Sequence, residues 1–393
     1  MRLNKSILIL PALAWGLGLG AYAQADRMLI QNEAKLAAAK AQYSAGNAVV
    51  TKDINGAIAD GDKALTAGPF SVTFHKAKMA PSGDIHDYVS QAPYWWADPS
   101  KPDGKPYIRR DGERNPEIYQ IHDDSQMGEM AQAVRKLGLA YYFTDNEKYA
   151  QKAAELLNVW FVKADTRMNP NFNYAQYIPG INDGRGIGII ESRGLTDIPD
   201  AIAMMAPSKA ITAELKAGVK QWFAEYLNWL QTSKNGKDEE HSQNNHGTFY
   251  DVQVVDFAMF TGDDKLARQV IKKRTISRMD TQFTTDGKQP LELERTKSWG
   301  YTNMNLDAWC RMAVLAQHLD IDLWHKQQNG RSIKQCIQFM MPFILGQQKW
   351  EYKQIEPIGY GETIGILAFA DGKFPDMDFK PAYKLHNAPK PWM

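Results

Sequence analysis

The chain has 393 residues, of which 44% are hydrophobic and 23% charged. This is the composition of a folded globular protein, long enough for one large core or two domains. A formal net charge of +1 excludes the strongly basic character that marks many nucleic-acid-binding proteins. Two cysteines, Cys310 and Cys336, are too few for a disulfide framework, and we expect two buried thiols rather than a bridge.

The N-terminus has the pattern of a secretory signal peptide. Arg2 and Lys5 precede an apolar run over residues 7–20, and a small-residue cleavage site follows. The run is short and rich in glycine, and no later segment reaches the about 18 continuous apolar residues that a membrane span needs. We therefore expect residues 1–25 to be a signal peptide, with an uncleaved anchor as the alternative. The mature chain should have no membrane span and be periplasmic or secreted.

The first part of the mature chain changes character at residue 69. Asp26–Ser44 is predicted to form a polar amphipathic helix that stops before Gly46. Residues 69–116 are rich in proline and glycine, which exclude long helices. A long irregular loop in a compact protein is usually functional. This segment also contains Trp95 and other aromatic residues that can stack on flat ligands, so we expect it to line a cleft.

From Asp123 onward the pattern predicts helices. Apolar residues recur at the spacing of one buried helix face in three stretches: Met127, Met130, Val134, Leu137 and Tyr141; Leu215, Val219, Trp222, Tyr226 and Leu230; and Leu306, Trp309, Ala313 and Ala316. Residues 143–150 and 260–267 repeat one pattern, in which an apolar helix ends, a polar turn follows and a second helix begins. Repeated helical hairpins predict an all-α fold, an (α/α) toroid or barrel. No linker divides residues 26–393, so we expect a single domain.

The stretch Asn244-Asn245-His246-Gly247 combines two amides with a histidine. An amide both donates and accepts hydrogen bonds, and histidine can act as an acid or a base. A cap on a helix over residues 248–260 explains one of these residues. It does not explain all three, and helix N-termini also bind anions. Asn245 and His246 are therefore candidate functional residues.

Arg295 and Tyr301 form a second candidate cluster, just before a helix that is predicted to begin near Asn303. The guanidinium fork of arginine matches a carboxylate, and a nearby cation helps a phenol to move its proton. Alone, these residues are expected to be a surface arginine and a core tyrosine. Together with the first cluster they fit β-elimination from a uronic acid, in which the carboxylate is neutralised, a base takes the C5 proton, and an acid protonates the departing O4.

The chain resembles the alginate lyase superfamily of α/α-toroid polysaccharide lyases. Asn245-His246, followed later by Arg295 and Tyr301, is similar to that superfamily's Asn/His/Arg/Tyr site, and residues 94–112 and 169–186 resemble its N-terminal signature. The resemblance is greatest to the family that contains alginate and glucuronan lyases. It implies an (α/α)7 barrel or an incomplete (α/α)6 barrel that cleaves 1,4-linked polyuronates, alginate first and glucuronan as the alternative.

The resemblance also implies a role for each residue of the four. Asn245 would neutralise the uronate carboxylate, and His246 would neutralise it or act as the base for one C5 epimer. Arg295 would hold the carboxylate and lower the pKa of Tyr301. Tyr301 would be the general acid, and also the base where both groups leave from the same face of the sugar.

Further residues are expected to bind the substrate. They come from the proline-rich loop, from a glycine-rich loop over residues 174–186 and from the surroundings of the two clusters: Tyr94, Trp95, Arg110, His122, Gln176, Asn182, Arg185 and Trp299. The alternatives are a tight structural loop at 174–186 and a helix N-cap at His122. His241 and His246 do not share a helix face. We therefore expect no metal, and we also expect no cofactor. The protein is expected to be a monomer. Its partner should be an acidic polysaccharide rather than nucleic acid.

Two other classes of function stay open from the residues alone. An α/α-barrel glycoside hydrolase would need two carboxylates on either side of the scissile bond, and Glu191, Asp251, Glu292 and Glu294 are available. The other class is a non-catalytic glycan-binding protein.

Overall fold

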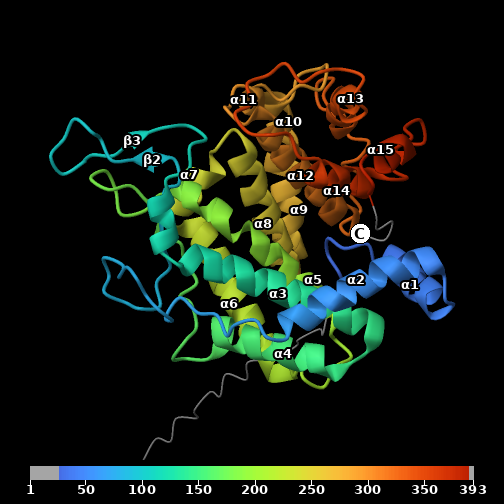
Figure 1. The fold of residues 1–393 in the computed structure, drawn as a ribbon, viewed down its shortest axis with the longest axis horizontal. Helices are drawn as coiled ribbons and strands as arrows, with labels where there is room; N and C mark the ends of the chain where they lie inside the picture. The colour runs from blue at the N-terminus through green and yellow to red at the C-terminus, as the bar shows by residue number, and fades with distance from the viewer. Residues whose placement is uncertain (1–25, 389–393) are drawn as a thin grey trace, which may run out of the picture.

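The computed structural model describes residues 26–388 of the chain, so the expected signal peptide lies outside the described residues. Helices dominate the described part, as Figure 1 shows, which confirms the all-α class. The strands are short and form two pairs: β1 (Val89–Gln91) runs parallel to β4 (Tyr174–Tyr177), and β2 (Trp95–Trp96) runs antiparallel to β3 (Ile108–Arg109).

The α-helices of the first half are α1 (Glu33–Ser44), α2 (Ala48–Ala64), α3 (Asp123–Thr144), α4 (Glu147–Leu157), α5 (Asp197–Met204), α6 (Ala213–Thr232) and α7 (Lys234–Glu240). Those of the second half are α8 (Asn245–Thr261), α9 (Asp264–Val270), α10 (Ile276–Gln282), α11 (Pro290–Leu293), α12 (Ser298–Gln317), α13 (Ile333–Ile344), α14 (Gly361–Ala370) and α15 (Lys380–Leu385). The 3-10 segments are η1 (Pro116–Gln120) and η3 (Gly186–Thr196), and the π segments are η2 (Asn158–Val162) and η4 (Ile271–Thr275).

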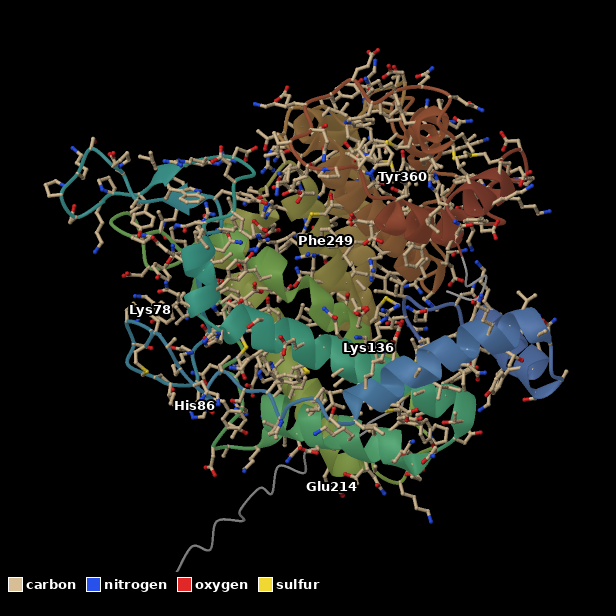
Figure 2. The ribbon with its side chains drawn as sticks, viewed as in Figure 1. Lys78, His86, Lys136, Glu214, Phe249 and Tyr360 are labelled. Atoms are coloured by element: carbon tan, nitrogen blue, oxygen red, sulfur yellow. The ribbon has the colours of Figure 1, made fainter. Side chains whose placement is uncertain are left out.

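Helix α8 is the centre of the packing. Nearly all of its residues are buried, on every face, which is how a helix enclosed by other helices behaves. It contacts α6, α9 and α12, and its Phe249 lies near the middle of the view in Figure 2. The buried faces predicted for α3 and α12 are confirmed, and in α6 only Leu215 of the predicted face is partly exposed. One cluster of buried side chains extends from Leu29 to Ala382, so both ends of the described chain share a core.

The two predicted hairpin joints are confirmed. Helix α3 ends at Asp145, which has a left-handed backbone, and Asn146 caps α4. Helix α8 ends at Gly262 in the same left-handed conformation, and the side chain of Asp263 caps α9. A left-handed residue followed by a side-chain cap ends one helix and starts the next within a few residues.

Three predicted helix starts are wrong. The first helix begins at Glu33 rather than Asp26, because the N–H groups of Leu29 and Gln31 donate to the buried carboxylate of Asp200. Helix α8 includes Asn245 and His246 instead of starting after them, and neither residue caps it. Helix α12 begins at Ser298, so Tyr301 lies in its first turn rather than before it.

The proline-rich segment is irregular apart from its short strands and η1, as predicted. In Figure 1 the part that carries β2 and β3 extends away from the helices at the left of the view. Its two ends are held in place, since β1 pairs with β4 and Asp111 binds Arg295 and Thr296. The segment therefore forms a wall beside the helix ends.

The structure also bears on membrane insertion and on the two cysteines. Among residues 26–388, no helix is long and apolar enough to cross a membrane. Cys310 and Cys336 are both buried free thiols, as expected.

Candidate active site

A cleft of about 680 Å³ lies between the proline-rich segment and the N-terminal ends of α8 and α12. All four candidate catalytic residues line it: Asn245, His246, Arg295 and Tyr301. The first two begin α8, and the other two flank the start of α12. The structure thus brings together the two clusters that are separated in the sequence.

Asn245 is completely buried and is held by Glu292. Its backbone N–H donates to Oε1 of Glu292 and its Nδ2 donates to Oε2, each over 2.7 Å. Burial raises the pKa of Glu292, and the hydrogen bonds from Asn245 only partly offset this effect. The side-chain Oδ1 of Asn245 is buried without a hydrogen-bond partner in the described structure. An unpaired buried amide oxygen is costly, so a hydrogen-bond donor placed beside this atom would be stabilising.

His246 is oriented by a second buried glutamate, Glu239. Its Nδ1 lies 2.7 Å from Oε1 of Glu239, whose side chain is 1% exposed. A carboxylate only accepts hydrogen bonds, so Nδ1 donates and the neutral ring carries its lone pair on Nε2. No partner for Nε2 occurs within residues 26–388. This arrangement makes His246 a candidate base.

Arg295 is anchored by Asp111 of the proline-rich segment. Its Nη2 donates to Oδ1 over 2.9 Å and its Nε donates to Oδ2 over 3.3 Å, and Thr296 also donates to this carboxylate. Although burial alone raises the pKa of Asp111, the guanidinium and Thr296 lower it below its ordinary value. Within residues 26–388 the other terminal nitrogen, Nη1, has no hydrogen-bond partner, so it can donate to a second anion.

Tyr301 lies under Arg295 and beside Tyr94. The guanidinium carbon of Arg295 is 3.8 Å from the Tyr301 ring centroid, which is a close cation–π contact. The Tyr301 hydroxyl donates to the Tyr94 hydroxyl over 2.9 Å. Burial and Tyr94 raise the pKa of Tyr301, and Arg295 lowers it by less. Arg295 lowers the pKa of Tyr301, as expected, but the net shift is upward. The phenol therefore stays protonated at neutral pH.

The opposite wall of the cleft is a polar network around Glu191. Ser90 and Tyr88 donate to Oε2 of this carboxylate over 2.6 and 2.8 Å. Arg185 donates to Oε1 of Gln176 over 2.8 Å, and the Gln176 backbone N–H donates to the Ser90 hydroxyl. Burial, then the neighbouring Asp124, raises the pKa of Glu191 to about 8. The carboxyl group of Glu191 is therefore protonated at neutral pH.

Half of the predicted substrate-binding residues line the cleft, namely Tyr94, Trp95, Gln176 and Arg185. The other four do not. Trp299 is 3% exposed and donates through Nε1 to the carbonyl oxygen of Gly359, so it is a buried residue that does not line the cleft. Arg110 points its guanidinium at the Trp96 ring, 5.1 Å from the centroid.

The remaining two residues lie next to the cleft rather than in it. His122 takes the N-cap position of α3 but makes no side-chain cap bond, and it does not line the cleft. Asn182 lines a neighbouring hollow, where its Oδ1 accepts the backbone N–H of Ile178. The glycine-rich loop is therefore both a tight turn and, through Gln176 and Arg185, a wall of the cleft.

The residues that position the site were not found from the sequence. Nothing in the local sequence marks Glu239 or Asp111 as functional, and the sequence offers Glu292 only as a hydrolase carboxylate. Asn245 and Glu292 are separated by 47 positions, and Arg295 and Asp111 by 184. No local pattern marks such pairs. Within residues 26–388, no group of three or more His, Cys, Asp or Glu side chains is placed to hold a metal ion.

The comparisons with known proteins concern the family and the fold of the chain. The model of the family described as alginate lyase matches residues 71–350. An alginate lyase from Bacteroides ovatus is 41% identical, with a TM-score of 0.87, over 93% of this chain and 97% of that one. Alginate lyase A1-III from Sphingomonas species A1 is 18% identical, with a TM-score of 0.55, over 91% and 95%. No curated protein matches the chain. The matches confirm the α/α toroid, and the number of its hairpins stays a prediction.

Proposed function

Since the chain belongs to the alginate lyase family and is a polysaccharide lyase, we propose that it cleaves alginate by β-elimination in the cleft between His246 and Tyr301. The proposal rests on the relative positions of His246, Tyr301 and Arg295. A histidine whose Nδ1 is held by Glu239, and whose Nε2 is free, shares the cleft with a protonated tyrosine stacked under a guanidinium. These are a base and an acid beside a cation.

The carboxylate of the uronate is the first group that the site must handle. Nη1 of Arg295 and the second Nδ2 hydrogen of Asn245 can donate to it, because Asp111 and Glu292 occupy the other side of each group. Neutralising this carboxylate lowers the barrier to C5 deprotonation, since the negative charge that develops on the carboxylate meets fixed donors. Asp111 and Glu292 also hold those donors still.

The proton transfers then follow. Nε2 of His246 takes the C5 proton, and the C5–H electron pair forms the C4–C5 double bond. The C4–O4 bond breaks with its electron pair on O4, and Tyr301 gives O4 its phenolic proton. No water is consumed in this step. The raised pKa of Tyr301 keeps it in the acid form that this role needs, and Arg295 stabilises the phenolate that remains.

A second assignment gives Tyr301 both proton transfers and leaves His246 as a carboxylate neutraliser. The stacked cation supports this assignment because it lowers the pKa of Tyr301, although burial and Tyr94 raise that pKa by more. The two assignments differ in their dependence on the C5 epimer. If His246 is a base, His246→Ala should reduce turnover of one of mannuronate and guluronate more than the other. Equal losses on both would assign His246 to neutralisation.

The geometry argues against glycoside hydrolysis. Glu292 and Asp251 are at most 1% exposed and are bound by Asn245 and by two arginines, and Glu294 lies outside the cleft lining. Glu191 and Asp124 line the cleft, but the hydroxyl of Tyr88 bonds to both of them. A sugar therefore has no room between them, as a pair of hydrolase carboxylates requires.

The test is to mix the purified protein with polymannuronate, polyguluronate and glucuronan and to follow the ultraviolet absorbance of the C4–C5 double bond. Rising absorbance with either alginate block supports the proposal. A rise with glucuronan alone would overturn alginate as the substrate. New reducing ends without absorbance would overturn elimination altogether.

We also propose that the protein is exported and acts as a monomer. Export rests on the sequence pattern of residues 1–25, and one chain supplies every residue of the cleft described above. N-terminal sequencing of the protein from the producing cells should find a chain that begins near residue 26. Light scattering should give the mass of one chain.

A further inference from the structure

A second hollow, of about 700 Å³, adjoins the cleft. We call it the distal hollow. It is lined by residues of four segments: 77–78, 105–107, 117–121 and 177–183. Gln91 and Ile121 line both the cleft and the distal hollow, so the two spaces meet at these two residues. None of the four candidate catalytic residues lines the distal hollow.

The floor of the distal hollow is a chain of side-chain hydrogen bonds. The Tyr177 hydroxyl donates to Oε1 of Gln91 over 3.0 Å, and Nε2 of Gln91 donates to Glu117 over 3.2 Å. The Tyr107 hydroxyl donates to the same glutamate oxygen over 2.8 Å. Burial and Glu117 raise the pKa of Tyr107 to about 12. The floor is therefore fixed, and it presents two phenol rings.

The walls are also fixed to each other. The backbone N–H of Tyr107 donates to the carbonyl oxygen of Pro179 over 3.1 Å. Gly180 has a φ of +78°, and a Cβ at this position would lie 2.9 Å from Cα of Pro106. Only glycine allows the two loops to approach so closely. The distal hollow therefore exists before any ligand binds, which lowers the entropic cost of binding.

Two lysines at the rim lack an acidic partner. Nζ of Lys78 lies 4.6 Å from the Tyr177 ring centroid, and Lys105 lies on the opposite loop. Neither makes a salt bridge within residues 26–388. Of the acidic groups in the lining, Glu117 is already bound by Tyr107 and Gln91, and Asp183 is exposed. Figure 2 shows Lys78 at the edge of the molecule, on the side where Figure 1 places the β2–β3 loop.

We propose that the distal hollow binds the uronate residues that continue beyond the scissile bond, with Lys78 and Lys105 holding their carboxylates and Tyr177 contacting a sugar face. This inference rests on the proposed function, because it needs a polyuronate in the cleft. A polyuronate carries one carboxylate on each sugar, so a chain that leaves the cleft past Gln91 brings anions to the two unpaired cations. Asn182 and Asp183 then face its hydroxyls as polar groups.

The test compares chain lengths. For the double variant Lys78→Ala/Lys105→Ala, kcat/KM is measured on uronate oligomers from the shortest that is cleaved up to the polymer. The ratio of kcat/KM for the longest to that for the shortest substrate should fall about five- to twentyfold, since each exposed ion pair contributes up to about 1 kcal/mol. The fall should shrink in high salt, which screens exposed charges. Lys101→Ala is the matched control, because Lys101 is an exposed lysine of the same loop outside the lining.

Two results would overturn the proposal: an unchanged ratio, or a ratio that falls as much for Lys101→Ala. Failure of the proposed function itself looks different, because the wild-type protein would then eliminate from no polyuronate of any length. In that case calorimetry with the longest oligomers still tests the distal hollow. Tighter binding to the wild type than to the double variant supports it, and equal binding overturns it.

Discussion

The cleft and a second, separate space are both lined by charged side chains, yet they differ in how those charges are satisfied. The cleft contains the reactive residues described above. The other space, which we call the α12–α14 cavity, has a volume of about 490 Å³ and lies between α12, α14 and residues 28–35. Its lining contains both acidic and basic side chains, among them Asp197, Asp307 and Arg311. None of the four candidate catalytic residues lines it.

In the α12–α14 cavity, two pairs of charged groups neutralise each other. Nε of Arg311 lies 2.7 Å from Asp307, and Arg135 lies 3.9 Å from Asp197. Lys35 donates to the carbonyl oxygen of Ala368. Glu362 also lines this cavity, and burial followed by Asp307 raises its pKa to about 7, so ion pairing accounts for only part of the lining.

In the cleft, a buried glutamate binds one side of each of two candidate catalytic side chains, Asn245 and His246. Glu292 holds Asn245 and leaves its Oδ1 unpaired, and Glu239 holds His246 by Nδ1 and leaves Nε2 free. A side chain that is held on one side and unpaired on the other is oriented and still available. Charge density alone therefore does not identify a site, and what sets the cleft apart is the combination of an amide, an imidazole, a guanidinium and a phenol in one lining.

The largest effect is expected from Tyr301→Phe. Removing the phenol removes the proposed acid, so kcat on alginate should fall about 10²- to 10⁴-fold. The ring that Arg295 contacts remains, so substrate affinity should change little. Rates and binding constants of the two proteins check this. A variant with a near-normal kcat would refute the acid role of Tyr301.

A smaller loss is expected when His246 keeps its ring but loses its carboxylate partner. In Glu239→Gln the amide can turn its donor to Nδ1, which moves the lone pair off Nε2. We expect kcat to fall about ten- to a hundredfold, with a changed pH profile of kcat and little change in KM. Glu294→Gln is the control, because Glu294 is exposed and lies outside the cleft lining. An unchanged pH profile would mean that Glu239 is only structural.

The third prediction concerns stability against pH. The folded-state pKa of Glu191 is raised to about 8, so its contribution to stability is complete below the ordinary glutamate range and is lost as the pH rises through about 8. Glutamine resembles the protonated acid, so Glu191→Gln should raise Tm relative to the wild type at pH 9 by the equivalent of a few kcal/mol. At pH 4 the two proteins should melt together. A Tm difference that does not depend on pH would contradict this titration.

The smallest effect on catalysis is expected from Asp307→Asn in the α12–α14 cavity. The change leaves Arg311 without its charged partner, so the free energy of unfolding should fall by about 1–3 kcal/mol. Because the cavity is separate from the cleft, kcat/KM of the folded protein should equal that of the wild type. A large loss of kcat/KM at full folding would break the distinction between the two spaces.

Local patterns accounted for much of the fold. The buried faces of α3 and α12 and the joint at Gly262 follow from spacing and capping within one stretch of chain, which is information that sequence carries directly. Helix starts were less predictable. The first helix begins late because Asp200, far along the chain, binds the N–H groups that precede it.

The sequence by itself determined the helical class and the chemical types at the site, an amide, an imidazole, a guanidinium and a phenol, because periodicity and residue chemistry are local properties. Only the tertiary structure decided which carboxylates stand behind them and which residues face the ligand. Glu292 reaches Asn245 across 47 positions, and Trp299 is buried beneath its neighbours although its position beside the site suggested contact with substrate. Pairing and burial depend on distances through space, and no local pattern encodes those distances.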